Sequence, residues 1–333
     1  MPGSRPTIYD VAKKAGVSIS TVSRVLNSPN KVNAETRVAV IDTISELGFI
    51  PKAEARARAL KNLGRIGVIT PFFTEPSFVQ RLRGVASVLT SSQYELVVFS
   101  VDSITNLNSY LETIPLTRNL DGLILISLQL TAEQAERLSK HNIEVVLIEY
   151  PMYSLNCLEI DDQSGGRMAA DHLLQKGYTN IDFIGTADTV EFGINPISSR
   201  LLGFKNRLME SGINLESQKI HYASHDIEAT RVLAKKVLTQ PNPPTAIFAA
   251  TDLQAIGVLR AAKELNVRVP QDLAVIGFDD LDLAEYFGLT TIHQPLDESG
   301  RIAAELLINR IQNPDRPAQH IRLPLTLIER ETA

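Results

Sequence analysis

The sequence predicts an α/β protein with a small helical domain at its N-terminus, and two patterns lead to this expectation. Between residues 7 and 47, apolar side chains recur at the spacing of short amphipathic helices. From Arg65 onward, short runs rich in Val, Ile, Leu and Phe alternate with amphipathic stretches, which is typical of a parallel sheet with crossover helices. With 333 residues, 44% of them hydrophobic, the chain can form one small and two medium-sized domains.

The first helix is expected to begin at Thr7 and to end at Gly16. Thr7 and Asp10 have the spacing of a capping box, which also places a carboxylate in the first turn, where it favours the helix dipole. Gly16 supplies the backbone freedom that ends such a helix. The expected buried face consists of Ile8, Val11, Ala12 and Ala15.

Two further helices would complete a helix-turn-helix domain over residues 1–50. After a turn at Gly16 and Val17, Ser18 can cap a second helix with buried positions at Val22, Val25 and Leu26. Its outward face would then carry Ile19, Ser20, Thr21, Ser23, Arg24 and Asn27. A third helix from about residue 33 to 47 is expected to bury Val38, Ile41, Ile44 and Leu47.

Positive charge is concentrated at the N-terminal end of the chain. Residues 1–65 carry 11 Lys and Arg against 5 Asp and Glu, a net charge of +6, whereas the remaining residues carry 22 against 33, a net charge of −11. In a chain with an overall charge of −5, this separation of charge indicates that the N-terminal end binds phosphate groups and the rest of the chain does not. We therefore expect the polar face of the second helix to bind DNA.

The segment from Thr7 to Asn27, T-I-Y-D-V-A-x-x-A-G-V-S-x-x-T-V-S-R-V-L-N, resembles the DNA-binding signature of the LacI/GalR family of bacterial transcription regulators. The resemblance continues through the whole chain. It implies that Ile19, Ser20 and Arg24 meet base edges in the major groove, and that Thr7, Thr21 and Ser23 contact phosphates. Arginine can pair with guanine through two hydrogen bonds, which gives about 1–3 kcal/mol of discrimination.

Residues 51–64 have the composition of the family's hinge helix, which folds on the operator and wedges a leucine into the minor groove. The position of that leucine, seven residues after Pro51, is Arg58 in this chain. An arginine there would sense a narrow, negative groove instead of unstacking a base step, so we expect weaker bending of the operator. Lys52, Arg56 and Arg58 are the expected DNA contacts of the hinge.

Periodicity alone leaves the α/β part open between a doubly wound pair of sheets and a closed eight-stranded barrel. The family resemblance implies the former, with two Rossmann-like subdomains of the periplasmic-binding-protein type. Their expected ranges are 65–161 with 291–320, and 162–290 with 321–333. A ligand cleft would lie between them at the carboxyl ends of the strands.

Carboxylates and a guanidinium at strand ends can hold vicinal hydroxyl groups without reacting with them. Such residues are Asp161, Asp252, Asp279 and Asp280 at strand ends and Arg200 at a helix start. The resemblance implies that Arg200, Asp161 and Asp252 are effector contacts, while Asp280 is expected to cap the following helix. The resemblance adds four further effector positions, Phe78, Glu149, Tyr150 and Gln294.

No catalytic or metal-binding motif is found in the chain, so we expect no enzyme activity, no cofactor and no metal. The single cysteine, Cys157, cannot form an internal disulfide and fits a reducing compartment. The chain has neither an apolar segment long enough for a membrane span nor an N-terminal signal segment, so a cytoplasmic location is expected.

The expected partners are double-stranded DNA with a near-palindromic operator, a small effector, most simply a sugar, and a second copy of the chain. One recognition helix reads only a few base pairs, so specificity requires a homodimer. The resemblance leaves an alternative, in which a phosphorylated carrier protein binds the surface instead of a sugar binding the cleft. Arg81, Arg83 and Arg118 are the candidate residues for that surface.

Overall fold

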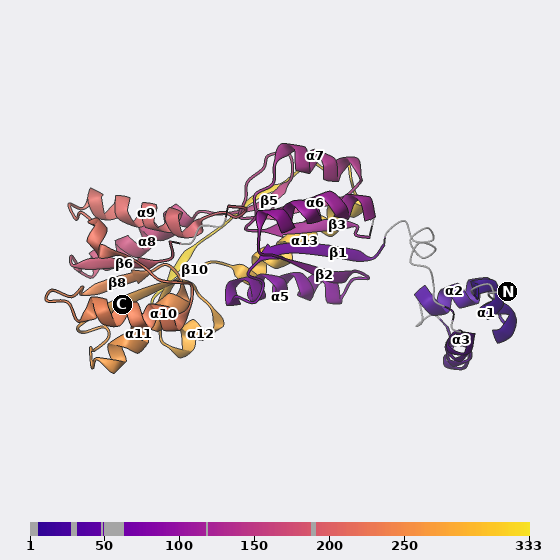
Figure 1. Cartoon of the computed structure of the whole chain (residues 1–333), viewed down its shortest axis with the longest axis horizontal. Coiled ribbons are helices and arrows are strands. Elements are labelled where there is room, and N and C mark those ends of the chain that lie inside the picture. Colours follow the sequence, from indigo (N-terminus) through magenta and orange to yellow (C-terminus); the bar gives the residue numbers. More distant parts are fainter. Residues whose placement is uncertain (1–5, 28–31, 48, 50–62, 118, 188–190) are drawn as a thin grey trace. The chain divides into compact units, whose positions relative to one another are not determined.

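The computed structural model describes the chain except residues 1–5, 28–31, 48, 50–62, 118 and 188–190 (Figure 1). It divides into two units, residues 1–63 and residues 64–333. Each unit has its own hydrophobic core and is described separately.

The described residues of the first unit form three helices, α1 (Ile8–Ala15), α2 (Ile19–Asn27) and α3 (Ala34–Leu47). They surround a small core in which Val11, Val22 and Val40 are fully buried. Both α2 and α3 pack against α1 and against each other. The predicted helix-turn-helix arrangement is confirmed.

The predicted helix caps are present. The backbone amide and the hydroxyl of Thr7 both donate to the Asp10 carboxylate, at 2.8 and 2.6 Å. Gly16 ends α1 in the left-handed conformation, with a φ of 65°. At the start of α2, the Ser18 hydroxyl accepts from the amide of Thr21 at 3.1 Å.

The predicted buried face of α3 is wrong in part. Val38 and Ile41 are 55% and 48% exposed, whereas Val40 and Thr43 are buried. The expected positions were three residues apart, and on a helix of 3.6 residues per turn this spacing drifts by about 60° per step. Val40, Thr43, Ile44 and Leu47 follow the true period and form the inward face.

The second unit contains two six-stranded sheets, so the doubly wound prediction is confirmed and the barrel is excluded. The strands of the first sheet, which are all parallel, run in the order β11-β5-β4-β3-β1-β2. Their bounds are β1 Arg65–Pro71, β2 Glu95–Val101, β3 Gly122–Ile126, β4 Glu144–Ile148, β5 Asn156–Ile160 and β11 His320–Leu323.

The second sheet runs in the order β12-β10-β9-β8-β6-β7 and is parallel except for the β10–β12 pair. Its strands are β6 Ile181–Gly185, β7 Ile220–Tyr222, β8 Ala246–Ala249, β9 Ala274–Asp279, β10 Thr290–His293 and β12 Thr326–Ile328. Both sheets bury nearly continuous apolar runs, as parallel strands covered on both faces must.

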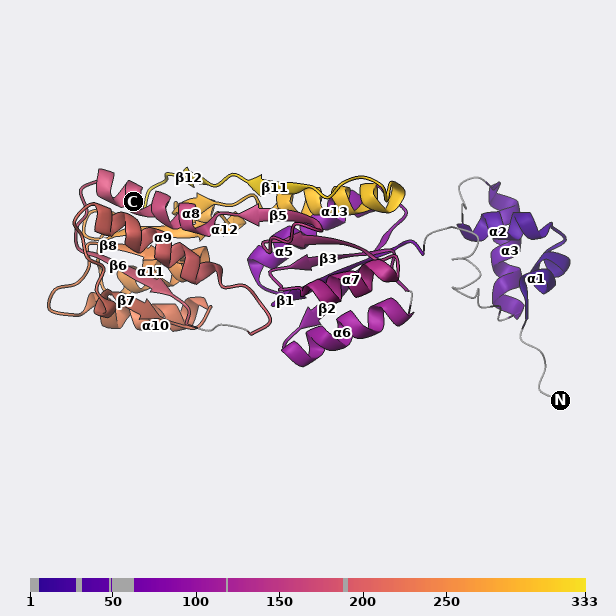
Figure 2. The same cartoon turned by 90° about the horizontal axis from the view of Figure 1, so that it is seen from above.

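Helices cover both faces of each sheet (Figures 1 and 2). On the first sheet, α5 (Pro76–Thr90) and α13 (Leu296–Gln312) pack on one face, and α6 (Ile104–Thr117) and α7 (Ala132–Lys140) pack on the other. On the second sheet the pairs are α8 (Asp162–Gln175) with α9 (Pro196–Glu210), and α10 (Ile227–Leu238) with α11 (Asp252–Glu264). Two short helices, η2 (Ser217–Lys219) and α12 (Asp282–Tyr286), lie in connections.

The chain passes between the two sheets three times. The passages follow β5, β10 and β11, and the last one leads directly into β12 (Figure 2). Since β10 pairs with β9 and β11 pairs with β5, the second and third passages lie a few residues later than the predicted limits at 291 and 321. We call the parts built on the first and second sheets the first and second subdomains.

Candidate functional site

The outward face of α2 carries the polar side chains that the sequence predicted. Ile19 is 41% exposed, and Ser20 and Arg24 are exposed beside it. Thr21 and Ser23 are half-buried. The Ser18 hydroxyl hydrogen-bonds to the hydroxyls of Ser20 and Thr21 at 2.7 and 2.8 Å, so the first turn of this face is held in place before any partner binds.

Thr7 lies at the start of α1, where its hydroxyl bonds Asp10. The side chain of Asn27 and the residues Lys52, Arg56, Arg58 and Arg118 lie outside the part of the chain that the structure describes. Their predicted roles therefore stay predictions.

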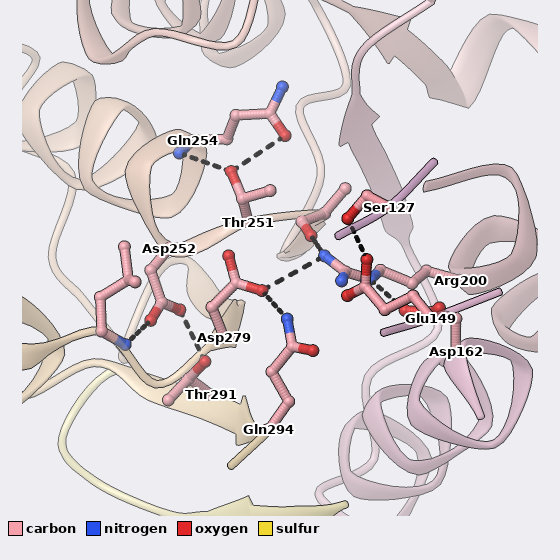
Figure 3. Close-up of polar contacts among 12 residues, drawn as sticks. Ser127, Glu149, Asp162, Arg200, Thr251, Asp252, Gln254, Asp279, Thr291 and Gln294 are labelled. Atoms are coloured by element: carbon pink, nitrogen blue, oxygen red, sulfur yellow. Dashed lines mark hydrogen bonds and ion pairs between the residues drawn. The ribbon is translucent and has the colours of Figure 1, made fainter. Parts of the chain in front are cut away.

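A second polar site lies where the carboxyl ends of the two sheets face each other (Figure 3). The side chains come from the ends of strands in both subdomains and from α5, α8 and α9. We call this group the interlobe cluster, and it comprises Arg81, Ser127, Glu149, Asp162, Arg200, Asp279 and Gln294.

Arg200 is the centre of the cluster in the second subdomain. Its side chain is only 3% exposed, and its Nε donates to Asp162 at 2.8 Å. One terminal nitrogen donates to the Ala250 carbonyl at 2.7 Å and lies 3.5 Å from Asp279. The guanidinium also stacks on Phe278, with its carbon 3.6 Å from the ring centroid. The guanidinium of Arg200 is therefore held through its Nε, one terminal nitrogen and one face.

Close helix packing places Arg200 beside Asp162. The two residues lie on α9 and α8, and Gly166 lets these helices approach, since a Cβ there would lie 1.9 Å from the Arg200 carbonyl oxygen. The same arrangement recurs in the first subdomain. A Cβ at Gly300 on α13 would lie 1.9 Å from the carbonyl oxygen of Arg81 on α5.

Arg81 links the first subdomain to the second. Its side chain is 3% exposed and donates to Glu149, which also accepts from the Ser127 hydroxyl. Arg81 donates in addition to the Gln294 side-chain oxygen at 3.3 Å, and the Gln294 amide nitrogen donates to Asp279 at 2.5 Å. A continuous set of polar contacts thus runs from Ser127 to Arg200.

The backbone is strained at several of these positions. Ser127, Glu149 and Asp279 have positive φ values of 56°, 73° and 115°, and Asp280 next to the cluster has 55°. Such conformations cost about 1–3 kcal/mol each in non-glycine residues and collect at functional sites. Their concentration at the strand ends indicates that the positions of these side chains matter more than local stability.

Burial shifts the protonation of the carboxyl groups. Desolvation raises the pKa of Asp162 to about 6, although the charge of Arg200 opposes the shift. Desolvation likewise raises the pKa of Asp279, again against the charge of Arg200. The pKa of the fully buried Asp252 is raised well above its usual value by desolvation and by the neighbouring Asp279.

Of the three expected effector contacts, only Arg200 belongs to the cluster. Asp161 caps α8 by accepting from the Ser164 amide at 3.0 Å, and its other oxygen lies 3.6 Å from Arg322. The carboxylate that meets Arg200 is Asp162, one residue later. The side chains of consecutive residues at a strand end point in different directions. The sequence alone therefore could not identify which of the neighbours Asp161 and Asp162 faces Arg200.

Asp252 lies next to the cluster and is held separately from Arg200. Its two oxygens accept from the Thr291 hydroxyl at 2.6 Å and from the Leu281 amide at 2.7 Å (Figure 3). Asp280 was expected to cap α12, and this prediction is wrong. Its carboxylate instead pairs with Arg330 at 2.8 Å and with His293 at 3.0 Å.

The remaining predicted effector residues are distributed around the cluster. Glu149 and Gln294 belong to it. Phe78 is half-buried, with Arg81 5.7 Å from its ring centroid, and Tyr150 packs on the core of the first subdomain. Sequence reasoning noted Asp279 at a strand end without choosing it as an effector contact, and it did not place Arg81, Ser127 or Asp162 in the cleft. Ser127 follows strand β3, which is a signal that could have found it.

Several buried side-chain nitrogens have no hydrogen-bond partner within the described part of the protein. Among the described residues they include Arg81 Nε, the side-chain nitrogen of Gln254 and Nε2 of His225. His225 lies close enough to lower the pKa of Asp279 through its charge. An unpaired buried donor costs about 1–3 kcal/mol, so a ligand oxygen that accepts from Arg81 Nε would remove this cost.

A groove of about 770 Å³ lies elsewhere in the described part of the chain. Residues of α10, α11 and the C-terminal segment line it, among them Ile227, Arg231 and Ile256. One group of possible metal ligands, Cys157, Glu159 and His320, has its donor atoms within 4.8 Å of one another, also away from the cluster. Burial raises the pKa of the Cys157 thiol, which disfavours the thiolate that a metal needs.

Comparison with known proteins identifies both parts of this architecture. Residues 7–52 match the model of bacterial regulatory proteins of the lacI family, and residues 170–333 match the periplasmic binding protein-like domain. Full-length relatives exceed 30% identity, among them the ribose operon repressor of Escherichia coli K12, which is 32% identical over 98% of this chain and 99% of its own. The chain belongs to the LacI family.

Another relative, catabolite control protein A of Priestia megaterium, is 32% identical over 96% of both chains. Among solved structures, the lac repressor dimer bound to operator and an anti-inducer has a TM-score of 0.77 at 26% identity, over 99% of both chains. A LacI family regulator from Enterococcus faecium with bound ribose has a TM-score of 0.70 at 27% identity, over 81% of this chain and 98% of its own. In the described part of this LacI-family chain, no helix is long and apolar enough to span a membrane.

Proposed function

We propose that this LacI-family chain is a repressor of a catabolic operon whose DNA binding is controlled by a small carbohydrate at the interlobe cluster. The observation that carries the proposal is the buried polar contact set that joins both subdomains through Arg81, Gln294 and Asp279. Relatives support it, because one is named a ribose operon repressor and a similar structure contains ribose.

The cluster has the chemistry that a sugar requires. Carboxylates accept from hydroxyl groups, while arginine and amide nitrogens donate to hydroxyl and ring oxygens. Arg200, Asp162, Asp279 and Gln294 would bind the effector directly. Of the other predicted contacts, Glu149 would hold Arg81, Phe78 and Tyr150 would form apolar walls, and Asp161 and Asp252 would support the local backbone.

Control of DNA binding follows from the position of the cluster. An effector that replaces the Arg81–Gln294 and Gln294–Asp279 contacts changes how the two subdomains are held together. Such a change alters operator affinity only if the effector prefers one arrangement, and the coupling is typically about 1–3 kcal/mol.

DNA would be bound by a homodimer, with one α2 helix on each half of a near-palindromic operator. The similar lac repressor structure is a dimer bound to operator. Base edges would be read by Ile19, Ser20 and Arg24, while Thr7, Thr21 and Ser23 would contact phosphates. Asn27 and the hinge residues Lys52, Arg56 and Arg58 complete the proposed DNA surface.

The competing proposal is control by a phosphorylated carrier protein, because catabolite control protein A is equally similar to this chain. The contacts of two of the three candidate arginines for a phosphoserine-binding surface are evidence against this competing proposal. Arg81 is buried in the cluster, and Arg83 is paired with Asp282 at 2.7 Å and with Asp297 at 2.6 Å. Neither offers a free basic surface for a phosphoserine.

The proposal can be tested with duplexes selected from a random DNA pool by the full-length protein. Operator affinity would be measured by fluorescence anisotropy with D-ribose, D-xylose, D-glucose and cellobiose. We expect one sugar to change the operator affinity roughly 5- to 150-fold, which corresponds to a coupling free energy of about 1–3 kcal/mol. Arg200→Ala should lose the response and retain DNA binding, while the control Arg167→Ala, an exposed arginine paired with Glu210, should retain both.

If none of these sugars changes operator affinity while a phosphorylated carrier protein does, the sugar proposal is wrong and the competing one holds. If Arg200→Ala still responds like the control, the effector binds elsewhere.

A further inference from the structure

The interlobe cluster and its neighbour Asp252 contain more acidic than basic groups. Glu149, Asp162, Asp252 and Asp279 provide four carboxyl groups, and Arg81 and Arg200 provide two guanidinium groups. The side chains of all six are less than 10% exposed. The raised pKa values of three of these aspartates have burial as their first cause, with other carboxylates adding to the shift for Asp162 and Asp252.

The positive charge of each guanidinium is already paired with an internal carboxylate. Arg200 is held by Asp162, Asp279 and the Ala250 carbonyl, and Arg81 is held by Glu149 and Gln294. Tight binding of a phosphate or carboxylate normally uses an arginine fork whose two N–H groups point at the anion. Here an anion would bind next to the carboxylates that already compensate the charge of both arginines.

A negatively charged ligand would also lie beside the carboxylates that hold the two arginines. Like charges a few ångströms apart repel more strongly in a buried site than in water, because the effective dielectric constant is lower there. Hydroxyl groups avoid this cost, because they donate to carboxylates and accept from the unpaired nitrogens of Arg81 and Gln254.

We propose that the interlobe cluster accepts uncharged polyhydroxy ligands and rejects their phosphorylated and carboxylated counterparts. Glu149 sets this selectivity by occupying Arg81. The inference rests on the proposed function and narrows it, since sugar phosphates and sugar acids are otherwise as plausible as effectors as the free sugars.

The test compares matched pairs of ligands by thermal shift and calorimetry with the full-length protein. The pairs are D-ribose with D-ribose 5-phosphate, D-glucose with D-glucose 6-phosphate, and D-glucose with D-gluconate. For any pair whose neutral member binds, the charged member should bind at least tenfold more weakly. A charged member that binds as tightly as its neutral partner, or more tightly, overturns the inference and leaves the proposed function standing. Binding by no member of any pair would instead count against the proposed function, and the inference would fall with it.

Glu149→Gln tests the role of Glu149 in particular. The amide keeps an oxygen that can accept from Ser127 and Arg81 but removes the charge, so the preference for the neutral member should fall at least tenfold. Glu149→Asp should preserve the preference, because it keeps the charge. The control Glu159→Gln changes a carboxylate on β5 outside the cluster and should also preserve it. An unchanged preference in folded Glu149→Gln would remove Glu149 from the explanation, and the wild-type comparison of pairs does not depend on this variant folding.

Discussion

At the scale of residues, Asp162 shows two opposing influences on one carboxyl group. Burial raises its pKa, and the neighbouring Arg200 lowers it, with burial dominant, so that the pKa is about 6. The folded protein therefore binds this proton more tightly than the unfolded chain, in which an aspartate has a pKa of about 3.9.

Asp162→Asn should reveal this balance. The stabilisation from a raised carboxyl pKa is complete below about pH 4 and is lost as pH rises through about 6, a change of roughly 2–3 kcal/mol. The unfolding free energy of the wild type minus that of the variant should therefore decrease between pH 4 and 6.5. Denaturant unfolding of the larger unit at several pH values measures this difference. A difference that grows with pH would show that Arg200 dominates and that the pKa is lowered.

Arg24 carries the residue-scale prediction for DNA. If it pairs with a guanine, Arg24→Ala should weaken operator binding by about 1–3 kcal/mol and relax the preference at one base pair of each half-site. Thr21→Val should weaken binding to all sequences alike, because phosphates carry no base information. Competition assays with operators changed at single positions distinguish the two. Equal loss on every sequence for Arg24→Ala would assign it to the backbone.

The roles of single residues were predicted well where their interaction partners are close in sequence. The caps Thr7, Asp10, Gly16 and Ser18 act within three or four residues of the chain, and they were predicted correctly. Arg81 was misjudged as a surface residue, because its partners Glu149 and Gln294 are 68 and 213 residues away.

At the scale of elements, the packing of α8 against α9 determines where Arg200 lies. The helices approach at Gly166, where a Cβ would lie 1.9 Å from the Arg200 carbonyl oxygen. The contact is with backbone, so a side chain cannot be accommodated by a rotamer change.

Gly166→Ala should therefore destabilise the larger unit by about 1–3 kcal/mol or more, as overpacking does. It should also weaken sugar binding, because α9 and Arg200 move away from Asp162. Gln175→Ala, at an exposed position of the same helix, should change neither property by more than about 0.5 kcal/mol. Thermal unfolding and ligand titration of both variants provide the measurement. Unchanged stability in Gly166→Ala would mean that the helices can separate without cost.

The sequence predicts which segments are helices and which are strands. It predicts less well which face of a helix is buried. The existence of α3 and its cap at Asn33, which accepts from the Thr36 amide at 2.8 Å, follow from local signals. The buried face of α3 could not be predicted from local signals, because Val38 and Val40 are both apolar. The packing of α3 against α1 and α2 decides which of the two is buried. The strand runs were equally clear, but their order in the sheets depends on contacts distant in sequence.

At the scale of the whole molecule, periodicity could not distinguish two open sheets from a closed barrel, since both use the same alternation of strands and helices. The difference lies in the three passages between the sheets, which bring β10 and β12 together in one sheet and β5 and β11 together in the other. These passages also place the carboxyl ends of both sheets opposite each other and so create the interlobe cluster. Neither the passages nor the cluster follows from composition.

The central claim is that the interlobe cluster both binds the effector and controls DNA binding. Calorimetric titration of the sugar that changes operator affinity, with and without saturating operator, tests it most directly. Linkage requires the operator to change the affinity for the sugar by the same factor by which the sugar changes the affinity for the operator. We expect equal factors in the wild type and no binding heat in Arg200→Ala. Equal sugar affinity with and without operator, or undiminished binding by Arg200→Ala, would contradict the account.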